Sequence, residues 1–263
     1  MGDFIRQPAV AGTFYPADPS ELVRTVDYYL QQAEADERPL PKAIIAPHAG
    51  YIYSGPVAAS AYARLRAARE EINRVILLGP SHYVPFRGLA TSSASHFQTP
   101  LGLVPLDRDL IHTLETLPQV QRLDEAHLQE HSLEVHLPFL QQVLDHFSLV
   151  PLVVGEATTG EVSEVLDLAW DGSETLIVIS SDLSHYHDYD TAHRMDSATS
   201  RAIESLNPDA IHYDDACGRN PVKGLLALAR KRGLHAHTVD LRNSGDTAGP
   251  KDRVVGYGAY VFD

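Results

Sequence analysis

Short apolar runs recur along the chain, and segments with helical spacing separate them. Residues 75–78, for example, read Val-Ile-Leu-Leu with no polar position between them. Unbroken runs of this kind are typical of parallel strands that are buried on both faces. We therefore predict strands at residues 42–46, 74–78, 148–154 and 176–179, and a further strand in the tail at 253–262.

The first of the intervening segments carries a clear helix start. Asp18 can accept a hydrogen bond from the first turn, and Pro19 suits the first helical position. An apolar stripe then follows at every fourth residue, formed by Leu22, Val26 and Leu30. This spacing predicts an amphipathic helix that buries one face.

Further helices are predicted at residues 56–68, 108–117, 133–145, 161–170, 191–206 and 221–231. The last has the clearest limits, because Asn220 can cap it, Pro221 opens it and Gly233 follows its end. Residues 86–105 lack helical periodicity, and we predict a β-hairpin there. No linker rich in proline, glycine or serine divides the chain. The pattern therefore predicts a single α/β domain over residues 1–263, with a mostly parallel or mixed central sheet flanked by helices.

Composition excludes several classes of protein. The formal net charge of −14 argues against a nucleic-acid binder, because such a surface repels phosphates. No apolar run approaches the roughly 18 residues of a membrane span. The first ten residues carry charges and lack the apolar run of a signal peptide. A single cysteine, Cys217, excludes an internal disulfide. We therefore expect a cytoplasmic protein with no nucleic-acid or membrane partner.

Histidines follow three of the predicted strands, at the point where each strand ends. They are His48, His82 and His185. Ligands of open α/β sheets bind beyond the carboxyl ends of parallel strands. If these strands are parallel neighbours, all three imidazoles reach one crevice.

Cys217 immediately precedes the predicted helix at 221–231, where the helix dipole and Arg219 should favour the thiolate. A thiolate and two neutral imidazoles suit iron, copper or zinc better than magnesium or calcium. Asp182, three residues before His185, is predicted either to orient an imidazole or to serve as a further ligand. His185 is predicted to donate and accept protons near neutral pH.

A second histidine cluster lies at residues 130–136. The spacing of His131 and His136 differs from that of helical zinc motifs. His131 and Glu134 can share a helix face. The sequence leaves two interpretations open for them, either a pocket or ligand-supporting role or simple capping of a helix start.

Seven segments, in order along the chain, resemble the Memo family (mediator of ErbB2-driven cell motility), whose prokaryotic members are called AmmeMemoRadiSam system protein B. They include Ala-Pro-His-Ala-Gly-Tyr-Ile-Tyr-Ser-Gly around His48, Leu-Gly-Pro-Ser-His ending at His82, and Ser-Ser-Asp-Leu-Ser-His-Tyr around His185. The segments are 6–16, 46–55, 78–82, 130–138, 180–186, 217–219 and 243–246.

The resemblance implies the fold of class III extradiol dioxygenases, enzymes that use non-haem ferrous iron. It implies that His48 and His82 are the metal-binding histidines and that His185 does proton work, with Asp182 and Cys217 completing the pocket. We expect the pocket to be lined or supported by Tyr51, Ser81, His131 and Glu134.

Cys217 stands where those dioxygenases use a carboxylate, and thiolate is softer and more oxidisable. The resemblance therefore favours a redox protein with one iron or copper ion per chain, with catalytic roles for His185 and Asp182, over a ring-cleaving enzyme. Zinc, as in a hydrolase, ranks below iron and copper. The alternative is a non-catalytic adaptor that uses the pocket for an anionic or peptide ligand, because some family members engage phosphotyrosine peptides. The family also implies a link to a radical-SAM protein.

Overall fold

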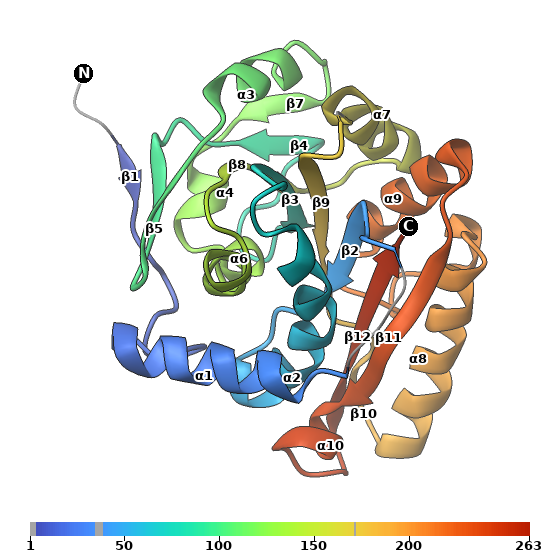
Figure 1. The fold of residues 1–263 in the computed structure, drawn as a ribbon. Helices are drawn as coiled ribbons and strands as arrows, with labels where there is room; N and C mark the ends of the chain where they lie inside the picture. The colour runs from blue at the N-terminus through green and yellow to red at the C-terminus, as the bar shows by residue number, and fades with distance from the viewer. Residues whose placement is uncertain (1–3, 35–38, 171) are drawn as a thin grey trace.

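A mixed β-sheet crosses the middle of the computed structural model, which describes residues 4–34, 39–170 and 172–263 (Figure 1). Its strands lie in the order β10-β12-β2-β9-β3-β8-β4-β7, and β11 pairs with β12. The bounds are β2 (Ala43–Ala46), β3 (Arg74–Pro80), β4 (Leu89–Thr91), β7 (Val120–Arg122), β8 (Ser148–Val154), β9 (Thr175–Ser180), β10 (His185–His187), β11 (Ala236–Asn243) and β12 (Val254–Phe262).

The strands in the centre of the sheet run parallel. β2 pairs with β9, β9 with β3 and β3 with β8, all in the same direction. β12 and β4 are antiparallel to their neighbours β2 and β8. The apolar runs of the parallel strands are buried, which explains their lack of polar alternation. The prediction of an α/β fold with a mixed central sheet is confirmed, and the fold is compatible with that of the dioxygenases.

Helices cover both faces of this sheet (Figure 1). One face carries α1 (Pro19–Gln32), α2 (Tyr51–Tyr62) and α6 (Leu137–Val143). The other carries α7 (Thr159–Ala169), α8 (Tyr189–Glu204) and α9 (Arg219–Arg232). A Cβ on Gly224 would lie 2.3 Å from Val162 Cγ1, so α9 and α7 can approach closely only because this position is glycine.

The remaining elements lie around this core. They are β1 (Ile5–Arg6), β5 (His96–Thr99), β6 (Gly102–Pro105), α3 (Arg108–Leu114), α4 (Glu125–Leu128), α5 (His131–Glu134), α10 (Ser244–Thr247), and 3₁₀ helices at Ala63–Ala68 and Pro208–Ala210. β1, β5 and β6 form a small separate sheet. The hairpin predicted within 86–105 is therefore confined to β5 and β6, whereas Leu89–Thr91 joins the large sheet.

The first helix agrees with its prediction. Asp18 accepts a hydrogen bond from the Glu21 amide at 2.9 Å, and the residues of the predicted stripe are buried. At the other end of the chain, Gly233 ends α9 in the left-handed conformation, with φ of 72°. The predicted cap of α9 is wrong, because Gly218 occupies the cap position. Asn220 lies in the first turn, and its side chain donates to the Gly155 carbonyl at 3.0 Å.

Two other predicted helices have different bounds. The helix predicted at 56–68 begins at Tyr51 and gives way to a 3₁₀ helix after Tyr62, so Pro56 lies inside it. The segment predicted as one helix at 133–145 is divided into α5 and α6. Pro138 lies in the first turn of α6, where its missing N–H prevents α5 from continuing.

The carboxyl ends of three neighbouring parallel strands meet at one edge of the sheet. β2, β9 and β3 are adjacent, and the segments after them carry Asp182 and the three predicted histidines. The topology on which the predicted crevice depends is therefore present. Among the described residues, no helix has the length and apolarity needed to cross a membrane.

Candidate metal centre

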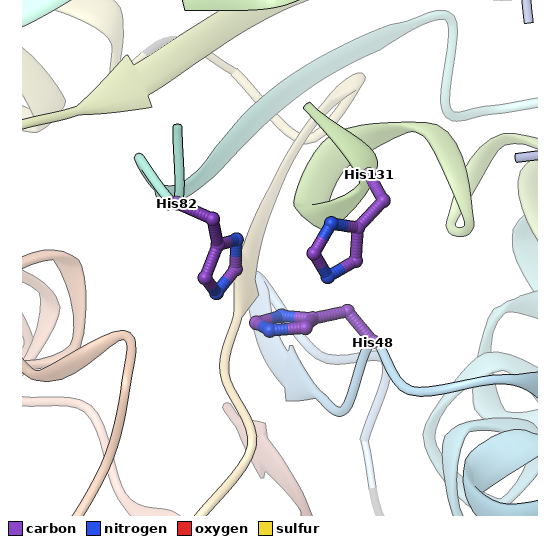
Figure 2. Close-up of side chains that lie close together, drawn as sticks. All are labelled: His48, His82 and His131. Atoms are coloured by element: carbon purple, nitrogen blue, oxygen red, sulfur yellow. The ribbon is translucent and has the colours of Figure 1, made fainter. Parts of the chain in front are cut away.

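Three imidazoles point toward one another at this edge of the sheet (Figure 2). His48 follows β2, His82 follows β3, and His131 begins α5. Each offers one ring nitrogen, and these nitrogens lie within 4.8 Å of one another. The rings of His82 and His131 are stacked with centroids 4.5 Å apart, and His48 lies edge-on to both.

His48 is held through its Nδ1 atom. That nitrogen lies 2.6 Å from the hydroxyl of Ser180, the last residue of β9. The Ser180 hydroxyl in turn donates its proton to the Ser132 carbonyl at 2.6 Å. Because a serine hydroxyl has one proton, Nδ1 must carry the hydrogen of the shared bond. The Nε2 lone pair of His48 is therefore available for a metal ion.

His82 is held in the same way by a carboxylate. Its Nδ1 lies 2.8 Å from Glu130 Oε1, and its main-chain amide donates to Glu130 Oε2 at 2.7 Å. Although burial opposes ionisation, the hydrogen bonds from His82 keep the pKa of Glu130 below its usual value. The ionised carboxylate requires a proton on Nδ1, which leaves the Nε2 lone pair of His82 available.

His131 is the third imidazole of the cluster. Burial, helped by nearby His82, lowers its pKa to about 4, so the ring is neutral near pH 7. Its Nδ1 is buried and has no hydrogen-bond partner among the described residues, although Glu130 Oε1 lies 3.6 Å away. Burial also lowers the pKa of His48. Neutral rings and an unpartnered buried nitrogen are what a transition-metal site needs before the ion binds.

Cys217 lies beside the histidine cluster. Its Sγ is 3.4 Å from His48 Nε2 and accepts a hydrogen bond from the Asp182 amide at 3.3 Å. The prediction of a thiolate is wrong for the protein without an ion, because burial and then the charge of Asp182 raise the pKa of the thiol. Arg219, which was expected to lower that pKa, instead stacks over the Tyr213 ring at 4.2 Å.

Asp182 and His185 border the same group. Asp182 Oδ1 accepts the main-chain amide of His48 at 2.8 Å, and Oδ2 lies 3.9 Å from His48 Nε2. Burial raises the pKa of Asp182, so this carboxyl holds a proton more readily than an exposed one. His185 Nδ1 donates to the Leu183 carbonyl at 2.8 Å, which leaves its Nε2 free to accept a proton.

A pocket of about 420 Å³ opens next to the cluster. Its wall includes Ser81, His82, His185, Tyr186, Tyr213 and Cys217. Tyr186 is 62% exposed and has a φ of 63°, a conformation that a bulky residue rarely adopts outside constrained sites. The pocket therefore gives a ligand access to an imidazole and to the thiol at once.

Two of the residues expected to line or support the pocket, Tyr51 and Glu134, lie behind α5 and outside the pocket wall. The Tyr51 hydroxyl donates to the Val135 carbonyl at 2.6 Å, and its ring packs in the core against Phe139. Glu134 is fully buried and accepts hydrogen bonds from Arg6 and from the amino-terminal segment. Both support α5 from behind and leave the pocket itself to other side chains.

Glu130 and Ser180 both hold imidazoles of the cluster, and neither was predicted to belong to the site. One signal was available, since Ser180 is the first polar residue after a buried run that ends beside Asp182. Glu130 precedes His131 directly, but nothing in the spacing indicates that its carboxylate reaches His82.

A mixed sheet whose central parallel strands end beside a group of imidazoles and a thiol defines an α/β protein with a candidate metal centre. Comparison with known proteins specifies the family. Residues 6–261 match the family described as Memo-like protein. The chain therefore belongs to the Memo family, as its resemblance indicated.

Relatives match over nearly their whole length. A MEMO1 family protein of Aquifex aeolicus (strain VF5) is 37% identical over 272 residues, which cover 98% of this chain and 99% of that protein. A MEMO1 family protein of Saccharolobus solfataricus is 36% identical over 283 residues, with the same coverage. One from Saccharolobus islandicus (strain M.14.25 / Kamchatka #1) is also 36% identical, over 284 residues.

Proposed function

We propose that this chain binds one iron or copper ion at His48, His82 and Cys217 and uses it in a redox reaction on a ligand held in the adjoining pocket. The observation that carries the proposal is that two imidazoles have the same hydrogen-bonding arrangement. Ser180 and Glu130 hold Nδ1 of His48 and His82, so both rings keep Nε2 for the ion. The unpartnered nitrogen of His131 also supports an ion within this histidine cluster.

One distance, from Cys217 to His48, supports Cys217 as the third ligand. With ligand bonds of roughly 2.0 Å for nitrogen and 2.3 Å for sulfur, two tetrahedral ligands of one ion stand about 3.5 Å apart. The separation of Cys217 Sγ from His48 Nε2 is 3.4 Å. The ring nitrogens of His48, His82 and His131 all lie within 4.8 Å of one another, so His131 also lies within reach of an ion held by the other two histidines. His131 is therefore proposed as a neighbouring donor that can enter or leave the ligand set.

The chemistry expected here follows from the donors. An ion with one sulfur and two nitrogen ligands would supply one-electron chemistry, whereas zinc, the lower-ranked metal, would supply Lewis acidity. His185 would accept or donate a proton at Nε2, on the side of the pocket. Asp182 would orient His48 through its main-chain amide and hold a proton near the thiol. We place the protein in the cytoplasm, where a thiol ligand stays reduced.

Metal analysis of the purified protein tests the proposal. Anaerobic reconstitution should give about one iron or copper ion per chain, and His48→Ala or His82→Ala should abolish binding. Cys217→Ser should remove a sulfur-to-metal absorption band, whereas His131→Ala should leave that band in place. His146→Ala is the matched control, because His146 lies in a separate hollow with Arg69. Unchanged binding by both His48→Ala and Cys217→Ser would refute the site.

One feature favours the adaptor alternative. Arg219 and Tyr213 line the pocket, with the guanidinium stacked over the ring at 4.2 Å, and Tyr213 is largely exposed. An anionic group on a peptide would find a cation and an aromatic surface there. Titration with phenyl phosphate, with and without a chelator, separates the two functions. Binding that needs Arg219 but no metal would favour the adaptor, and absence of binding would remove it.

A further inference from the structure

Three consecutive residues, Glu130, His131 and Ser132, connect the parts of the histidine cluster. They contact His82 and the serine that holds His48, and they supply the third imidazole. The Glu130 carboxylate holds Nδ1 and the main-chain amide of His82. The Ser132 carbonyl accepts the Ser180 hydroxyl, which fixes His48. His131 supplies the third ring itself (Figure 2). One short segment thus connects rings that follow two different strands.

The segment is itself fixed in position. Glu130 Oε1 accepts the Ser132 amide at 2.9 Å, so the same oxygen caps α5 and holds His82. The Ser132 hydroxyl donates to the Pro80 carbonyl at 2.9 Å, which ties the segment to the end of β3. A Cβ on Gly79 would lie 2.7 Å from the Ser132 hydroxyl oxygen, so this close approach requires glycine at the strand end.

We propose that the Glu130–His131–Ser132 segment is the positioning element of the site and sets the ring tautomers of His48 and His82, so that both carry hydrogen on Nδ1. The functional role of these tautomers rests on the proposed metal site, but the tautomers themselves form without any ion. Each ring has its own acceptor, an ionised carboxylate for His82 and a serine hydroxyl already committed as donor for His48. Substitution of one acceptor should therefore change the tautomer of one ring and leave the other ring unchanged.

The chemical consequence is preorganisation. A neutral imidazole in water exchanges between its two tautomers, and only the form with a free Nε2 can bind an ion placed at the centre of this cluster. When both rings are fixed before the ion binds, the tautomer that cannot bind the ion is not populated. Removal of such supporting groups typically lowers metal affinity about 10–100-fold. We expect a loss of this size when either acceptor is removed.

Nitrogen-15 NMR of histidine rings in the metal-free protein tests the proposal, at a pH above the usual histidine pKa of about 6.5. In the parent protein, His48 and His82 should both show the Nδ1–H tautomer. Glu130→Gln should shift His82 toward the Nε2–H form and leave His48 unchanged, because the glutamine amide can donate to Nδ1. Ser180→Ala should shift His48 toward the Nε2–H form and leave His82 unchanged. Ring signals are assigned with His48→Asn and His82→Asn.

His146→Ala is the matched control, because it removes an imidazole that lies in a separate hollow with Arg69. Both tautomers should persist in it, and its metal affinity should equal that of the parent. Nε2–H rings in the parent, or rings insensitive to Glu130→Gln and Ser180→Ala, would overturn the proposal. Since this measurement uses no metal, correct tautomers in a protein that binds no ion would refute the metal site alone.

Discussion

Glu134 is a fully buried carboxylate with several hydrogen-bond partners. Its replacement by glutamine should lower the stability of the fold by an amount that can be calculated. The buried carboxylate forms an ion pair with Arg6, whose side chain is 1% exposed. It also accepts the amides of Ala9 and Val10 at 2.7 and 3.0 Å and the Tyr15 hydroxyl at 2.6 Å. Glu134→Gln preserves the shape but leaves the buried Arg6 charge without its partner.

The expected loss follows from the burial of the pair. Breaking a buried ion pair by removing one partner costs roughly 3–5 kcal/mol. Unfolding entropy near the midpoint is about 2.1 cal/mol/K per residue, or about 0.55 kcal/mol/K for this chain of 263 residues. Dividing the first figure by the second predicts that the midpoint of thermal unfolding falls by about 5–9 °C.

Urea and thermal unfolding of Glu134→Gln measure this loss. Two controls define its origin. Tyr15→Phe removes one hydrogen bond and should cost only about 1 kcal/mol. The double variant Arg6→Met with Glu134→Gln should recover part of the loss, because it leaves no charge unpaired and keeps a side-chain oxygen that can accept from the amides of Ala9 and Val10. A Glu134→Gln protein of parental stability that bound metal more weakly would refute this reasoning and return Glu134 to the pocket.

Three further predictions concern the stability of the fold. Burial lowers the pKa of His127 to about 4 and that of His136 to about 3, from 6.5. Below pH 6.5 the unfolded chain therefore binds more protons, so the urea midpoint should fall as pH drops toward 4, and less steeply in His127→Gln. Gly224→Ala should cost about 1–3 kcal/mol in urea unfolding through its clash with Val162, and Val162→Ala should restore part of it. Gly233→Ala should cost about 1 kcal/mol because of its positive φ, whereas unchanged stability would contradict its capping role.

The sheet was the most predictable part of the structure. Unbroken apolar runs indicate burial on both faces, and that condition holds for β3 and β9 whatever their neighbours. Helix limits were less predictable where proline was involved. Pro56 is a good first residue by local preference, yet the contacts of α2 with α1 and the sheet keep it in the second turn. Local preference is weak compared with packing of this kind.

The site was predictable as far as strand ends determine it. His48 and His82 could be placed at one edge because parallel neighbours end together. Which side chain receives each Nδ1 could not be inferred, since Glu130 and Ser180 reach the rings only after distant segments have packed. The ionisation of Cys217 depends in the same way on burial and on Asp182, neither of which is visible in the local sequence around the helix start.

The two ends of the one-turn helix α5 contact different parts of the molecule. At its start, His131 joins the other imidazoles and packs its ring 4.8 Å from that of Phe14. At its end, Glu134 holds the backbone of residues 9 and 10. Docking of the amino-terminal strand and completion of the histidine cluster are consequently coupled events. A truncated chain that began after Pro16 would leave the carboxylate exposed and an imidazole unsupported, even with the central sheet intact.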